Sequence, residues 1–226
     1  MTILLAAAAL VAAAGAIAAL APGDARLGLV GLAATLIGAA LLADPLPSPA
    51  VLAVRLAGAM LAIALVRAGV PATGDRPADS AHHAGSRLGW VAEALLGLSG
   101  AVAGLAIAAG ITTFTPVGGA PVLPSTTSSL PFLTEAGLAV GLAGLMAAIA
   151  LGPTLLDRAG LRRTVATVVT VQGVILLRLG LAGRPSALEE VALAALLVAV
   201  AATAALLSRA AQPGPDARAE AAGSRS

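Results

Sequence analysis

Residues 136–156 read AGLAVGLAGLMAAIALGPTLL, an apolar stretch without a single charged side chain. A helix needs about 20 such residues to cross the hydrocarbon core of a bilayer, and it satisfies its own backbone hydrogen bonds there. The stretch lacks the alternation of period two that marks the strands of membrane β-barrels. It therefore predicts a transmembrane helix.

Further apolar stretches of this kind lie on both sides of it. They cover 164–182 and 191–208 after it, and 88–110, 50–66, 27–43 and 2–21 before it. Segment 27–43 is short, and the sequence leaves open whether it crosses fully. Segment 2–21 has no basic region before its apolar run, which favours an uncleaved helix over a secretory signal. We expect an all-α, polytopic integral membrane protein with about seven transmembrane helices.

The composition agrees with this class and excludes several functions. Charged residues make up 11% of the chain, whereas soluble domains carry about 25%. The lack of cysteine excludes disulfides, iron–sulfur ligation and thiol nucleophiles. No motif for phosphate, zinc, acyl-transfer or dinucleotide chemistry occurs, and His82 and His83 lack further ligands at matched spacing. We predict no catalytic residue, cofactor or metal site, and no nucleic-acid partner.

The arginines predict the orientation of the chain. Every basic residue is an arginine, and with seven crossings most arginines outside the spans fall on one side. Because cytoplasmic loops are enriched in positive residues, the N-terminus is expected outside and the C-terminus inside a bacterial-type cytoplasmic membrane. The predicted outer side holds Arg178 and Arg184, and the cytoplasmic side holds Arg26, Arg67, Arg76, Arg87, Arg158, Arg162, Arg163, Arg209, Arg218 and Arg225.

Polar, proline-containing stretches divide the apolar segments into blocks. The expected order is a three-helix block (1–66), a cytoplasmic loop (67–87), a fourth helix (88–110), an external loop rich in Pro, Ser and Thr (111–134), a three-helix module (135–208) and a disordered cytoplasmic tail (209–226).

Three ionisable residues inside the predicted spans are candidate intramembrane polar sites: Arg55, Glu93 and Arg178. Charge in the hydrocarbon region is costly, so such residues are candidates for function. At 1.5 Å per residue, Arg55 and Glu93 differ in depth by roughly 8 Å, so an ion pair between them would be stretched. Arg178 lies at the level of Glu189 and Glu190, where a local ion pair is expected.

Each candidate also has a structural interpretation. Arg178 can extend to the outer interface, and Glu93 can lie at headgroup level beside the interfacial Trp90. Arg55 is the hardest to explain in this way, because it lies deeper in its span. A counter-ion in this chain or in a partner subunit is the structural interpretation, and binding of a transported anion is the functional one.

Two local patterns predict structure rather than chemistry. The pairs Gly100–Gly104 and Gly137–Gly141 have the GxxxG spacing that lets two membrane helices approach closely. Glu189 and Glu190 open the last apolar segment, where the helix dipole favours acids, so a capping role is expected.

The last three apolar segments follow a recognisable order. A Gly-rich segment, EAGLAVGLAGLMAAIALGPTLL (135–156), leads through the basic turn LDRAGLRR (156–163) to TVATVVTVQGVILLRLGLAG (164–183) and a final span. This order resembles the K-type subunit of respiratory complex I. It resembles more closely the membrane component E of hydrogenase-4 and formate-hydrogenlyase-type complexes, which has extra N-terminal helices. Arg55, Arg67 and Pro71 are similar to the pattern of that family's corresponding helix, so the resemblance covers roughly 50–210.

This resemblance implies an accessory, non-redox membrane subunit of a proton-translocating oxidoreductase complex, packed in the bilayer between larger antiporter-like subunits. The family's intramembrane acids are missing here, at Val171–Gln172–Gly173 and near Leu196, which favours a scaffold over direct proton translocation. The alternative is a self-standing transporter of small anions that uses Arg55. A membrane enzyme has the least support, because catalytic groups are not clustered.

Overall fold

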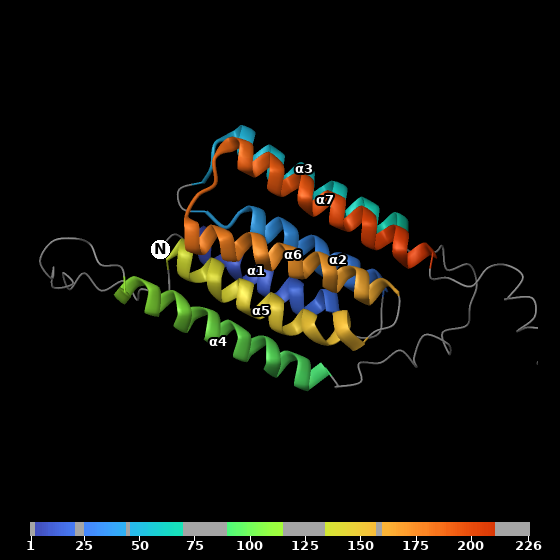
Figure 1. Ribbon diagram of the computed structural model, residues 1–226, viewed down its shortest axis with the longest axis horizontal. Helices are drawn as coiled ribbons and strands as arrows, with labels where there is room; N and C mark the ends of the chain where they lie inside the picture. The colour runs from blue at the N-terminus through green and yellow to red at the C-terminus, as the bar shows by residue number, and fades with distance from the viewer. Residues whose placement is uncertain are drawn as a thin grey trace, which may run out of the picture.

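The chain is helical wherever the structure describes it. The computed structural model describes residues 3–20, 25–43, 46–69, 90–114, 134–156 and 160–210. Within these ranges it contains seven helices and no strand (Figure 1). They are α1 (Ile3–Leu20), α2 (Ala25–Ala40), α3 (Pro49–Gly69), α4 (Trp90–Phe114), α5 (Glu135–Leu156), α6 (Leu161–Ala182) and α7 (Ala187–Ala210).

Six of these helices are long and apolar enough to cross a membrane, and α2 is the shorter exception. The 16 residues of α2 extend about 24 Å at 1.5 Å per residue. An all-helical protein with several membrane-length apolar helices agrees with the predicted class. Residues 70–89, which include His82 and His83, and residues 115–133 and 211–226 lie outside the described residues.

The helix ends differ from the predicted segments where the sequence is polar. α6 already begins at Leu161 and α7 at Ala187, so the end of the basic turn and the paired acids are helical. α4 continues to Phe114, into the predicted external loop. Pro49 opens α3 directly after Ser48, whose Oγ accepts a hydrogen bond from the Val51 N–H at 3.4 Å. Such caps favour helix beyond the apolar run.

Helices α1, α2, α5 and α6 form the centre of the bundle, with the other three at its flanks. Figure 1 shows α4 beside α5 on one flank, and α3 and α7 side by side on the other. The principal packing partner of α4 is α5, and α3 and α7 are the principal partners of each other. Packing therefore crosses the chain-order blocks, because α3 of the first block lies against α7 of the last.

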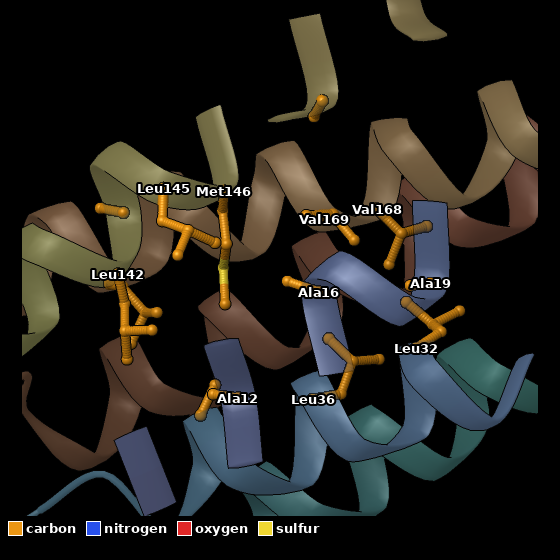
Figure 2. Close-up of a cluster of buried hydrophobic side chains, with 14 of the residues drawn as sticks. Ala12, Ala16, Ala19, Leu32, Leu36, Leu142, Leu145, Met146, Val168 and Val169 are labelled. Atoms are coloured by element: carbon orange, nitrogen blue, oxygen red, sulfur yellow. The ribbon is translucent and has the colours of Figure 1, made fainter. Parts of the chain in front are cut away.

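One apolar core lies mainly among the central four helices, and α3 and α7 add buried residues to it (Figure 2). Met146 of α5 and Val168 and Val169 of α6 are fully buried there, together with Leu32 and Leu36 of α2. Apart from Leu5 and Leu20, α1 contributes alanines to this core, which include Ala12, Ala16 and Ala19. Small side chains let α1 approach its neighbours closely, which is how membrane helices gain packing contacts.

Glycines bring particular helix pairs into backbone contact, as the GxxxG pair of α4 predicted. A Cβ atom added to Gly100 would overlap the carbonyl oxygen of Gly144 on α5, and one added to Gly104 would overlap that of Val140. On the other flank, a Cβ atom on Gly58 of α3 would lie 3.0 Å from that of Ala194 on α7. These contacts fix which helices are neighbours.

Contacts at the bundle ends show that successive helices run in opposite directions. At one end, Arg162 at the start of α6 donates to the carbonyl of Leu20, the last residue of α1, at 3.0 Å. Thr164 and Ser208 join the start of α6 to the end of α7 at 2.8 Å. At the other end, Arg184 pairs with Glu135 at the start of α5, at 2.9 Å. Below, the first is called the Arg162 end. The second is called the Glu190 end, because α7 begins there and Glu190 lies in its first turn.

Candidate functional site

Among the described residues, the most buried ion pair joins Arg55 of α3 to Glu190 of α7. The Arg55 Nε donates to Glu190 Oε2 at 3.0 Å, and Nη2 contacts Oε1. The remaining nitrogen, Nη1, donates to the carbonyl of Ala40, the last residue of α2, at 3.5 Å. Both side chains are largely buried. Every nitrogen of the guanidinium thus has an acceptor, and the pair links three helices.

The local sequence of α7 explains why Glu190, and not Glu189, meets Arg55. Ser186 precedes the helix, and its N–H donates to Glu189 Oε2 at 2.7 Å while its Oγ accepts from the Glu189 N–H at 3.4 Å. This reciprocal arrangement is a capping box, which holds Glu189 at the helix start. The next residue points about 100° further round the helix, which directs Glu190 toward α3. The predicted capping role applies to Glu189.

A second buried pair joins Glu93, in the first turn of α4, to Arg162, in the first turn of α6. Arg162 Nη2 donates to Glu93 Oε1 at 2.6 Å and to Oε2 at 2.5 Å. Its Nε reaches the carbonyl of Leu20, which has no intrahelical donor because α1 ends there. One arginine therefore connects α1, α4 and α6 at the Arg162 end.

Arg178 lies near the end of α6, and its side chain is more exposed than those of Arg55 and Arg162. Its Nη2 donates to Glu189 Oε1 at 2.9 Å, so the expected local ion pair forms. Its Nη1 donates to the carbonyl of Gly183 at 2.7 Å. The side chain thus satisfies the C-terminal carbonyl of its own helix and ties it to the start of α7.

The stretched pair between Arg55 and Glu93, considered from their depths, does not form. The structure places the two residues at opposite ends of the bundle, each with its own partner. Depth alone gave a poor estimate because it carries no information about which helices are neighbours. The sequence predicts a capping role for Glu190 and a position in the basic turn for Arg162, so it does not identify them as partners. The sequence does contain one signal for the partner of Arg55. Ser186 and Glu189 have the spacing of a capping box, which leaves Glu190 for another contact.

A cavity of about 60 Å³ lies next to the Arg55–Glu190 pair, between α2, α3, α6 and α7. Its wall is mostly apolar, and the ion pair and the amide of Gln172 are its polar groups. Gln172 is buried and lies near the middle of α6. The lining residues are Leu36, Ala39, Ala40, Arg55, Ala59, Gln172, Ile175, Leu176, Leu179, Pro185, Glu190, Leu193, Ala194 and Leu197.

These sites can do different things chemically. The two buried ion pairs hold helices together, and their carboxylates already accept charge-assisted hydrogen bonds. The cavity offers space and hydrogen-bonding groups to a small polar molecule. Across the described ranges, no group of three or more His, Asp or Glu residues is placed to hold a metal ion.

Comparisons of the chain with models of known protein families, with curated proteins and with solved structures give no match. The likeness to the K-type and component E subunits therefore stays a prediction from the order of segments in the sequence.

Proposed function

We propose that this chain is an accessory, non-redox integral membrane subunit of a hydrogenase-4-like or complex-I-like proton-translocating oxidoreductase complex. In this proposal it crosses a bacterial-type cytoplasmic membrane seven times, with its N-terminus outside and its C-terminus inside. It packs beside larger antiporter-like membrane subunits and adds no redox chemistry. The family assignment is supported by the layout of residues 135–208, and the orientation by the distribution of arginines.

The observation that supports a scaffold most directly is the engagement of Arg55. Its three guanidinium nitrogens have acceptors in Glu190 and in the α2 backbone. A paired, largely buried arginine of this kind holds its helices together, because breaking the pair would leave a buried charge uncompensated, and it has little remaining attraction for an anion. The same geometry weighs against the alternative of a self-standing anion transporter, since that function needs Arg55 to receive the solute.

The outer surfaces of the flanking helices fit a position within a larger assembly. On α4, large apolar side chains such as Leu95, Leu98 and Val102 are exposed, and α7 exposes Leu206 and Leu207. In the membrane these faces meet either lipid or the helices of neighbouring subunits. The proposal assigns part of this surface to neighbouring subunits.

Affinity purification from the native host tests the proposal. A tagged chain, extracted in a mild detergent, should co-purify with larger membrane subunits and with the redox subunits of one complex, identified by mass spectrometry. The Arg55→Ala variant should lose this association at equal expression, whereas Val174→Ala, at an exposed position on the central helix α6, should keep it. A monodisperse monomer that binds and transports an anion would contradict the proposal.

A further inference from the structure

The amide of Gln172 is a polar group without a partner inside an apolar protein. Its side chain is 7% exposed, and no residue among the described ranges forms a hydrogen bond with it. Buried amides in native proteins are almost always hydrogen-bonded, either to the protein or to ordered water. A hydrogen-bonding partner for the Gln172 amide therefore has to occupy the cavity that the amide lines.

That space is the cavity between α2, α3, α6 and α7. Two helices line it with one continuous face each, at the spacing i, i+3, i+4 and i+7, which in α6 is Gln172, Ile175, Leu176 and Leu179. The matching face of α7 is Glu190, Leu193, Ala194 and Leu197. The cavity therefore extends along both helices rather than lying at a single level.

The cavity reaches from the Glu190 end to the middle of the bundle. Pro185, in the turn between α6 and α7, lines the cavity at the Glu190 end of the bundle. Gln172 lies 10 residues before Ala182, the end of α6, which corresponds to a depth of about 15 Å. Glu190 and Arg55 lie between these limits, so polar groups occur along the path and at its inner limit.

The size and chemistry of this space fit water. A cavity holds a water molecule when it offers roughly 10–15 Å³ and two or more polar partners. This one has about 60 Å³, and it offers the Gln172 amide, the Glu190 carboxylate and the Arg55 guanidinium. The Gln172 amide can donate and accept, so water can link it to the carboxylate.

We propose that this cavity is a water-filled pocket that carries solvent from the Glu190 end of the bundle to Gln172 at mid-depth. Its ligand class is water or another uncharged hydrogen-bonding molecule of that size. The ion pair is neutral as a whole, and the remaining wall is hydrocarbon, so ions are not favoured. The inference rests on the bundle being in a membrane, and it holds whether or not the chain is a subunit of a larger complex.

Thiol accessibility tests the pocket, because the native chain contains no cysteine. In Gln172→Cys, reconstituted into vesicles, hydrogen peroxide, which is small and uncharged, should oxidise the thiolate to a sulfenic acid with release of water, and the lost thiol is read out by later alkylation after denaturation. Two dry controls are Val174→Cys, on the outward face of α6 and 57% exposed in the absence of lipid, and Met146→Cys in the core. Because only hydrated thiols ionise readily, Gln172→Cys should react about tenfold faster than either control.

The result that would overturn the inference is a Gln172→Cys thiol that reacts as slowly as that of Met146→Cys. A second variant covers the case in which the cysteine disturbs packing. If the pocket is dry, Gln172→Leu removes an unsatisfied amide and raises the thermal unfolding midpoint. If it is filled with water, Gln172→Leu removes a satisfied group and does not raise the midpoint, as we expect. Accessibility of Gln172→Cys in a chain that purifies alone would support the pocket while contradicting the proposed subunit role.

Discussion

Arg55 and Glu190 are 135 positions apart in the chain, yet they form the main polar contact between α3 and α7. Each is a costly residue inside a membrane, and each offsets part of the cost of the other. The value of such a pair lies less in net stabilisation than in the penalty for breaking it, because removal of one partner leaves a buried charge uncompensated. This asymmetry makes the pair testable.

Replacement of Arg55 by alanine should destabilise the protein by about 3–5 kcal/mol, the range for breaking a buried pair. Lysine should restore part of the loss, since it keeps the charge but cannot contact both carboxylate oxygens as the guanidinium does. The measurements are protein abundance in the membrane and unfolding in a denaturing detergent. Normal abundance and assembly of Arg55→Ala would rule out a structural counter-ion and favour anion binding.

The adjacent acids of α7 should respond very differently to the same change. The Glu190 side chain is 6% exposed and that of Glu189 is 52% exposed. We expect Glu190→Gln to cost several times more stability than Glu189→Gln, which removes a surface pair and part of a cap worth about 1 kcal/mol. Unfolding midpoints of the two variants, measured side by side, decide this. Equal losses would show that Glu190 is only a cap.

At the scale of the element, α4 depends on glycine for its place in the bundle. It contacts the centre chiefly through α5, where the Gly100 and Gly144 backbones meet. A side chain at this point cannot be accommodated by rotamer changes, because the atoms it meets are backbone. Overpacking of this kind typically costs about 1–3 kcal/mol.

The Gly100→Leu variant should therefore unfold at a lower denaturant concentration and lose the α4–α5 contact. Ala103→Leu is the matched control, since Ala103 lies on the exposed face of the same helix, and surface changes usually stay within about 0.5 kcal/mol. Cross-linking between cysteines placed on α4 and on α5 can report the contact. A control variant as unstable as Gly100→Leu would show that α4 buries both faces.

The sequence located the helices well but not their neighbours. Apolar length is a local property, so each predicted segment contains most of one helix. Helix ends depend on caps such as Ser186 with Glu189, which extend a helix past its apolar run. Neighbours depend on small-residue faces, and Gly and Ala occur throughout these segments, so no single pairing is specified. The packing of α3 beside α7 could not be predicted for this reason, and the partner of Arg55 depended on it.

For the molecule as a whole, the polar contacts gather at its two ends. The Arg162 end joins α1, α4, α6 and α7, and the Glu190 end joins α2, α3, α5, α6 and α7. Between them the described core is apolar except for Thr35, whose Oγ1 donates to the carbonyl of Gly31 at 2.8 Å, and Gln172. An apolar middle between two polar ends is the distribution that a bilayer requires.

The orientation of this bundle in the membrane gives the last prediction. Successive helices reverse direction, so residues at the two ends must face opposite compartments if every helix crosses. The arginine distribution predicts that the Glu190 end faces outside. Ala187 and Ala210, at the first and last positions of α7, are both exposed and suit single-cysteine labelling in a chain without native cysteine.

In intact cells, an impermeant maleimide should label Ala187→Cys and should label Ala210→Cys only after the membrane is permeabilised. The reverse pattern would invert the orientation while leaving the fold unchanged. Labelling of both positions in intact cells would show that α7 does not cross the membrane. That outcome would also contradict the water-filled pocket, since its path to mid-depth follows α7.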